Sequence, residues 1–152
     1  MSESDPLSPE LHRRLAVAAF NRTWELVDAT DRDRADDDEM LRTAFASRYH
    51  WEHIGGDAER ATGDWQIAHV ASLMGLADTA LRFARSSLDR AETAGFTGWR
   101  LASAREGMAR AMAAAGDRAG RDRYVALARE ALREETDYED RELIESQLAT
   151  VP

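Results

Sequence analysis

The residues that come nearest to a site of chemistry are two histidines on one helical stretch. His50 and His53 lie three residues apart in the sequence RYHWEH, so a helix would turn both imidazoles toward the same side. Asp57 follows with a carboxylate, and His69 is the further imidazole that we expect nearby. Imidazoles and carboxylates are ligands that zinc and iron accept. A metal site at His50, His53 and His69 is therefore one interpretation, and surface or packing histidines are the interpretation that we prefer.

Trp65 and His69 are spaced for a shared surface. They stand four residues apart, so on a helix they would offer an aromatic platform beside a titratable donor. In the alternative, which we favour, Trp65 fills the core and His69 is a semi-buried histidine with its hydrogen bonds satisfied.

Glu106 and Arg110 have the i, i+4 spacing of a helical ion pair, and Trp99 precedes them by one to two turns. In a binding site, Arg110 would bind a ligand carboxylate. The interpretation that we prefer is a solvent-exposed pair, which stabilises a helix by only about 0.3 to 0.5 kcal/mol.

Signatures of enzymes are missing from the sequence. It has no phosphate-binding glycine loop, no H-E-x-x-H and no G-x-S-x-G, and it has no lysine for a Schiff base. The acidic run over residues 31–38 lacks the glycine and the distal glutamate of a calcium loop, so we expect a solvated loop that caps the next helix. We identify no catalytic residue, expect no cofactor, and favour a non-enzymatic protein.

The composition narrows the possible partners. The 152 residues suit one domain, and the net charge of −9 disfavours nucleic acid. Cysteine is absent, which is compatible with a reducing cytosol. No leader sequence and no membrane-spanning apolar run are apparent. We therefore expect a soluble cytoplasmic protein that binds neither nucleic acid nor membrane.

The elements that must position these residues are all helical. Apolar residues recur at helical spacing, without any alternating strand pattern, over about 9–29, 40–54, 57–74, 76–94, 99–115, 118–132 and 137–148. The expected N-caps are Ser8, Asp57, Asp117 and Thr136. We expect residues 1–7 to be a disordered tail and residues 8–152 to form a single domain.

Two glycines mark an internal repeat. Gly75 and Gly116 stand 41 residues apart, and each ends an alanine-rich helical stretch that another such stretch follows. Periods of this length are typical of stacked helical hairpins. Short loops require antiparallel neighbours, and small residues allow helix axes to approach closely; these are Ala68, Ala80, Ala109 and Ala128.

In this pattern the sequence resembles the tetratricopeptide repeat (TPR) superfamily. In the fuller copy, the family's small positions and interhelix turn fall on Ala68, Gly75, Ala80, Ala84 and Ser87, and in the weaker copy on Ala109, Gly116, Val125 and Ala128. Ala71 and Met112 replace the family's aromatic residue, Arg121 occupies a small-residue position, the period exceeds the usual ~34 residues, and no terminal proline follows. The resemblance implies three antiparallel hairpins in a right-handed array with a C-terminal capping helix.

The resemblance also implies a binding surface. In this family the first helix of each hairpin lines a concave face that binds peptides or proteins, which suggests a scaffold or adaptor. Transferred by position, that face contains Thr62, Trp65, His69, Ser72, Trp99, Ser103, Glu106 and Arg110. Two alternatives stay open: a small-ligand or metal-binding protein centred on His50, His53 and His69, and a homo-oligomer that uses the small-residue faces and the last helix.

Overall fold

Seven α-helices form from the seven stretches of helical periodicity. The structure, a computed structural model, describes residues 4–152, and within that range no β-strand occurs. The helices are α1 (Pro9–Asp28), α2 (Arg34–Ile54), α3 (Asp57–Leu73), α4 (Ala77–Thr93), α5 (Gly98–Ala114), α6 (Arg118–Leu132) and α7 (Tyr138–Leu148). The expected all-α fold is confirmed.

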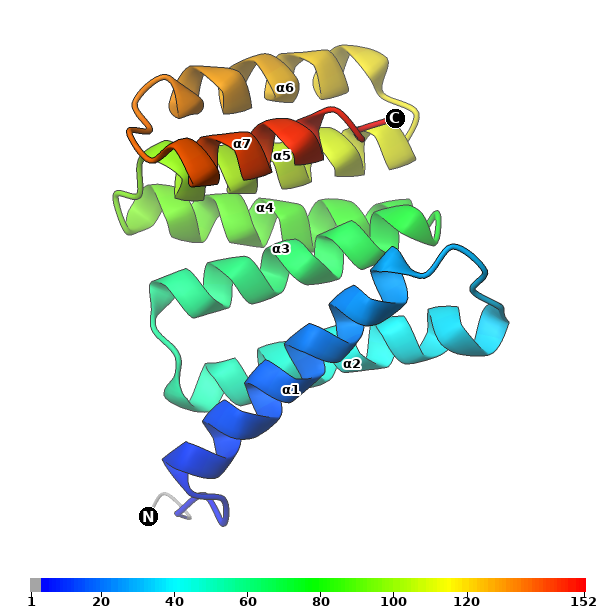
Figure 1. The fold of residues 1–152 in the computed structure, drawn as a ribbon, viewed down its shortest axis with the longest axis vertical. Helices are drawn as coiled ribbons and strands as arrows, with labels where there is room; N and C mark the ends of the chain where they lie inside the picture. Colours follow the sequence, from blue (N-terminus) through cyan, green and yellow to red (C-terminus); the bar gives the residue numbers. More distant parts are fainter. Residues whose placement is uncertain (1–3) are drawn as a thin grey trace.

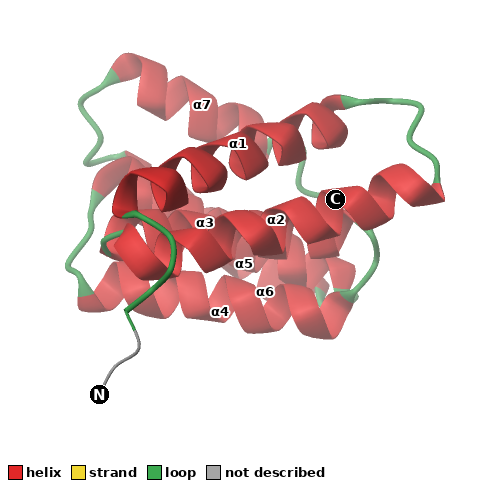
Figure 2. Cartoon of the chain, turned by 90° about the horizontal axis from the view of Figure 1, so that it is seen from below, coloured by secondary structure: helices red, strands yellow, loops and turns green. Residues whose placement is uncertain are grey.

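Consecutive helices pair as antiparallel hairpins, which stack in one direction (Figure 1). The pairs α1/α2, α3/α4 and α5/α6 pack closely, α3 also contacts α5, and α7 folds back over α5. In the view from below, α1 and α7 lie at the top, α3 and α5 in the middle, and α4 and α6 at the bottom (Figure 2). The odd-numbered helices therefore form one face of the array.

The two glycines of the repeat end α3 and α5 in the same way. Gly75 and Gly116 have φ angles of 72° and 78°, a left-handed conformation that glycine adopts without strain. At Gly75, the Leu76 N–H donates to the Ala71 carbonyl at 2.9 Å, and the corresponding bond follows Gly116 at 2.9 Å. This is the Schellman pattern of a helix C-terminus. Both helices contain 17 residues, so the first helices of the second and third hairpins match in length as well as in turn.

The core runs along the stack as three successive clusters. The first lies between α1, α2 and α3, the second between α3, α4 and α5, and the third between α5, α6 and α7. Alanine dominates the second cluster, which lets the helices pack closely there. The four small residues expected at close helix contacts are all buried: Ala68, Ala80, Ala109 and Ala128.

Side-chain caps hold two helix starts as expected. Ser8 accepts a hydrogen bond from the Leu11 N–H at 3.1 Å, with Pro9 as the first helical residue. Asp117 accepts from the Gly120 N–H at 2.8 Å. Each cap satisfies a backbone donor that has no partner within its helix.

Three predicted helix starts were wrong. Helix α2 begins at Arg34, so the second half of the acidic run expected as a loop lies in the helix; Asp33 caps the helix as the loop was expected to do, forming a capping box with Asp36 where negative charge is favourable. Helix α3 includes Asp57, and its N-cap is Gly56, whose backbone N–H donates to the Glu59 carboxylate at 3.0 Å. Helix α7 is capped by Asp137 rather than by Thr136.

The N-terminal tail was predicted to be disordered over residues 1–7. Residues 1–3 of that prediction lie outside the described residues. Residues 4–7 form no helix, and the Asp5 carboxylate contacts His12 of α1 and His53 of α2. Across residues 4–152, every helix is too short or too polar to cross a bilayer.

Candidate functional site

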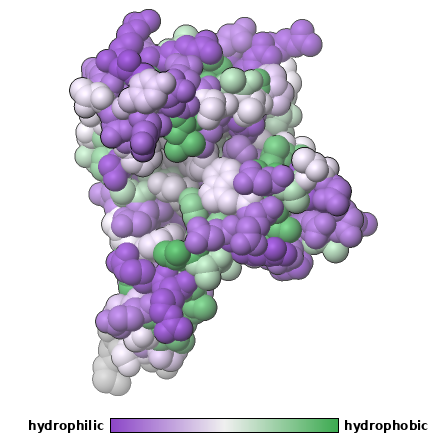
Figure 3. Space-filling model, in the orientation of Figure 1, coloured by the Kyte–Doolittle hydropathy of each residue, from purple (hydrophilic) through white to green (hydrophobic). Residues whose placement is uncertain are grey.

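A groove opens on the face of the odd-numbered helices, between α1 and α7. In Figure 3 this face is hollowed between its upper and lower parts, with pale and green side chains in the hollow and a largely purple rim. The cavity measures about 500 Å³. Its walls and floor are lined by Phe20, Trp24 and Asp28 of α1, Thr62 and Trp65 of α3, Trp99 and Ser103 of α5, and Leu143, Ile144 and Gln147 of α7.

A second hollow of about 240 Å³ continues the groove toward the start of α3. It shares Phe20, Thr62 and Trp99 with the main cavity and extends over Val17 and Trp51. The two hollows together form a path lined mainly by aromatic and aliphatic groups. We call this path, over both sets of lining residues, the concave groove.

Four of the eight residues predicted to bind a partner lie together in this groove. Thr62 and Ser103 are half-buried on its floor, and Trp65 and Trp99 provide aromatic surface. Ser72 does not line it and donates to the carbonyl of Ala68 in its own helix at 2.8 Å. The other three predicted residues lie beneath the groove, in the core.

Trp65 belongs to both the groove and the core. Its side chain is only 5% exposed, and its indole Nε1–H donates to Glu106 Oε2 at 2.7 Å. Glu106 is fully buried and also accepts from Arg110 Nε at 2.9 Å. The ion pair that we expected to be solvent-exposed is therefore buried, because Trp65 and α7 cover it.

Arg110 ties the floor of the groove to its α7 wall. Its Nη2 donates to Thr150 Oγ1 at 2.8 Å and to the Gln147 carbonyl at 3.1 Å, while it also pairs with Glu106 at 2.8 Å. The guanidinium thus binds Glu106 within α5 and also the end of α7. In this arrangement Arg110 positions α7 and is not presented to a ligand.

His69 lies against the two tryptophans beneath the groove. Its ring centroid is 5.4 Å from those of Trp24 and Trp65. Burial, with the nearby charge of Arg110 adding to it, lowers the pKa of His69 to about 3, so the ring is neutral at pH 7. Its Nδ1 is buried without a hydrogen-bond partner among the described residues, so the histidine with satisfied hydrogen bonds that we expected is not what the structure has.

The other histidines gather where α1 crosses α2. His53 Nδ1 lies 2.8 Å from Asp5 Oδ2, and His12 Nε2 lies 2.6 Å from the same oxygen. His12 Nδ1 lies 2.9 Å from His50 Nδ1. We had expected His69 to be the third imidazole beside His50 and His53. In the structure His12 takes this place.

His12 was missed because it is far from its partners in the sequence. It lies 38 residues before His50, and only the crossing of α1 over α2 brings them together. One signal was present: His12 stands four residues before Ala16, on the apolar line of the first helix. A histidine on that line is buried, and His12 is only 2% exposed.

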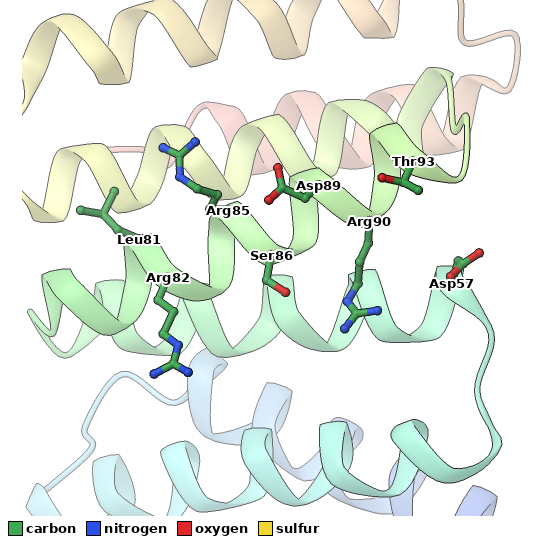
Figure 4. Close-up of a pocket in the computed structure, with 8 residues that line it drawn as sticks. All are labelled: Asp57, Leu81, Arg82, Arg85, Ser86, Asp89, Arg90 and Thr93. Carbon is green, nitrogen blue, oxygen red and sulfur yellow. The ribbon is translucent and has the colours of Figure 1, made fainter.

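A third cavity, of about 670 Å³, runs along α4 on another face of the molecule. Figure 4 shows side chains spread along the helix, with Leu81 and Arg85 turned away from Arg82 and Arg90. Ser86 and Arg90 both donate to the buried carboxylate of Asp64, at 2.8 and 3.0 Å. Ser86 and Arg90 are therefore already engaged with Asp64, which leaves fewer polar side chains along this trough to bind a ligand.

Comparison with known proteins adds no family. The chain matches no family model and no curated protein.

Proposed function

We propose that this protein is a non-enzymatic interaction module that binds a segment of a protein or peptide partner in the concave groove. The observation that carries the proposal is the groove itself, a cavity of about 500 Å³ with walls from α1 and α7 and a floor from α3 and α5. Surfaces of this kind, concave and rich in aromatic groups, are where binding energy concentrates in protein interfaces.

The lining favours an apolar segment as the occupant. Phe20, Trp24 and Trp99 are half-buried, so each keeps part of its ring available for contact. An aliphatic or aromatic anchor that covers these rings would remove apolar area from water on both partners. The helix α7 gives an internal example, since Ile144 and Leu148 pack one turn apart against α5 and α6.

The charge of the chain favours basic residues at the ends of that segment. Asp28 lines one end of the groove and Glu59 lines the other, although Arg100 also borders the second hollow. The net charge of −9 attracts a basic partner at long range. We therefore propose a partner segment with apolar anchors between basic flanks.

We also propose that the array is a divergent member of the TPR superfamily. The equal lengths of α3 and α5 and their matching glycine turns support this. The groove lies on the odd-numbered helices, the same helices that line the binding face in that family. A reducing cytoplasm is the location that we propose, because the chain has no cysteine.

A display library of random peptides tests the proposal. Peptides selected on the wild-type protein are expected to bind with micromolar affinity and to be enriched in apolar anchors with basic flanks. Ser103→Arg places a long charged side chain on the groove floor and should weaken their binding by at least about 10-fold. Ala126→Arg adds the same side chain at an exposed position of α6 and should leave the affinity unchanged.

Two outcomes contradict the proposal. A library that yields no binder to the folded protein contradicts the proposal that it is a peptide-binding interaction module. Selected peptides that bind Ser103→Arg as tightly as the wild type place the binding surface outside the groove.

Small-ligand binding in the same groove is the second candidate. The volume of about 500 Å³ falls within the range of small-molecule pockets. A fragment library screened by tryptophan fluorescence tests it, since three tryptophans line the cavity. This candidate is favoured if fragments bind the wild type but not Ser103→Arg, and if the peptide library yields no binder. A concentration-dependent dimer in light scattering, lost in Ser103→Arg, instead favours a second copy of the chain as the occupant.

A further inference from the structure

The cluster at the N-terminal end of α1 brings together three potential metal ligands from distant parts of the chain. Asp5 precedes α1, His12 lies in its first turns, and His53 lies in the last turn of α2. One ligand atom from each lies within 4.8 Å of the other two. The Asp5 Oδ2 atom is close to both imidazoles, at 2.6 Å from His12 Nε2 and 2.8 Å from His53 Nδ1.

The carboxylate is oriented for this role by its own turn. Asp5 Oδ1 accepts the Leu7 backbone N–H at 2.9 Å, which leaves Oδ2 directed at the imidazoles. An aspartate carboxylate is ionised at neutral pH, as a metal ligand must be.

His12 is held by a neighbour on its other ring nitrogen. Its side chain is 2% exposed, and its Nδ1 lies 2.9 Å from His50 Nδ1. When Nε2 binds a metal, Nδ1 carries the ring proton, and this N–H donates a hydrogen bond to His50 Nδ1. Histidines that bind metals commonly donate their second nitrogen in this way, which fixes the tautomer and the orientation of the ring.

From these contacts we propose that Asp5, His12 and His53 form a zinc site, separate from the concave groove, with His50 as a positioning residue. Two imidazole nitrogens and one carboxylate oxygen match a zinc site with three protein ligands, which leaves a fourth position for water. The site links the residues before α1 to the end of α2, so bound zinc fastens the N-terminal segment to the first hairpin.

Zinc binding requires a small local movement. Metal–ligand bonds of about 2.0 to 2.2 Å place tetrahedral ligand atoms roughly 3.3 Å apart, so the two contacts of Asp5 must lengthen by about 0.5 to 0.7 Å. The His53 ring, stacked on His12 at 4.4 Å and 9°, must also tilt out of that stack. The side chains of His53 and Asp5 are 33% and 34% exposed, which gives both room to move and gives the ion a path of entry.

Titration of the metal-free protein with zinc tests the site, and cobalt provides a visible spectrum for the ligand geometry. Wild-type protein should bind one equivalent. Asp5→Asn and His53→Ala are partly exposed substitutions, and each should weaken zinc binding by at least about 100-fold. His50→Ala removes only the positioning bond and should weaken it by about 10- to 100-fold. Tyr138→Ala removes an exposed tyrosine ring on α7, outside the cluster, and should leave the affinity unchanged.

Three results would overturn the assignment. The first is binding of less than about 0.1 equivalent of zinc by the folded wild type. The second is an Asp5→Asn variant that binds as tightly as the wild type. The third is a loss in a folded His69→Gln variant as large as in His53→Ala, which would assign the metal to a different set of histidines.

Discussion

The buried pair of Glu106 and Arg110 gives a sharp prediction for stability. Glu106 is fully buried and Arg110 is 4% exposed, so either charge left alone would lack both water and its partner. Removing one member of a buried ion pair costs about 3 to 5 kcal/mol. We therefore expect Glu106→Gln and Arg110→Met each to lower the free energy of unfolding by roughly this amount.

The double variant separates the charge from the packing. Glu106→Gln keeps an acceptor for the indole of Trp65, and Arg110→Met keeps an apolar stem of similar length. Because the pair is then neutral, the double variant should lose no more than either single variant. Arg121→Met is the matched control: Arg121 also donates to the C-terminal segment, at the Pro152 carbonyl, but on an exposed surface, so it should cost less than about 1 kcal/mol.

Urea unfolding followed by circular dichroism measures all four variants. Amide hydrogen exchange supplies a second readout, because Arg110 donates to Gln147 and Thr150 at the end of α7. Arg110→Met should selectively lower the protection of α7. Single losses below about 1 kcal/mol, or additive losses in the double variant, would refute the reasoning.

Three further predictions concern single positions. Burial lowers the pKa of His69 from 6.5 to about 3, so between these pH values the unfolded chain binds a proton that the folded chain does not. The free energy of unfolding should therefore be highest above about pH 6.5 and fall by up to roughly 1.4 kcal/mol per pH unit as the pH decreases toward 3. Urea unfolding at about pH 6.5 and about pH 4.5 should show a smaller decrease in His69→Gln than in the wild type. Gly75→Ala and Gly116→Ala force an alanine to φ angles of 72° and 78° and should each cost about 1 to 2 kcal/mol, measured as a lowered melting temperature, whereas an unchanged value contradicts the left-handed turn. Gly107→Ala places a Cβ 2.7 Å from Trp65 Cδ1, so the free energy of unfolding should fall by about 1 to 3 kcal/mol through overpacking and recover about 1 kcal/mol through better helix propensity. The tryptophan emission should shift, whereas an undisturbed ring would leave it unchanged.

The sequence predicted the helices well because their signals are local. Periodicity and the turns at Gly75 and Gly116 depend on residues that are close in the chain, and the structure has these helices in the expected order. The errors lie at the helix starts. Thr136 and Asp137 can both cap a helix, and the sequence does not say which one forms the bond. An aspartate run such as residues 36–38 has low helix propensity but gains stability beside a helix N-terminus.

The candidate sites were harder to predict because they depend on contacts between distant residues. Trp65 and Glu106 are 41 residues apart, and their hydrogen bond turns an expected surface pair into a buried one. His12 reaches His50 only because α1 crosses α2. Positions four apart on one helix predicted which side chains share a face, but the sequence did not reveal which element covers that face.

Binding in the concave groove is most directly tested by nuclear magnetic resonance, with a selected peptide added to isotopically labelled protein. The backbone amide shifts should change most at Thr62 and Ser103 on the groove floor and at Leu143 on the α7 wall. The amides of Arg82 and Ser86 along the α4 trough should change little. The largest shifts along α4, with the floor of the groove unperturbed, would contradict the proposed function.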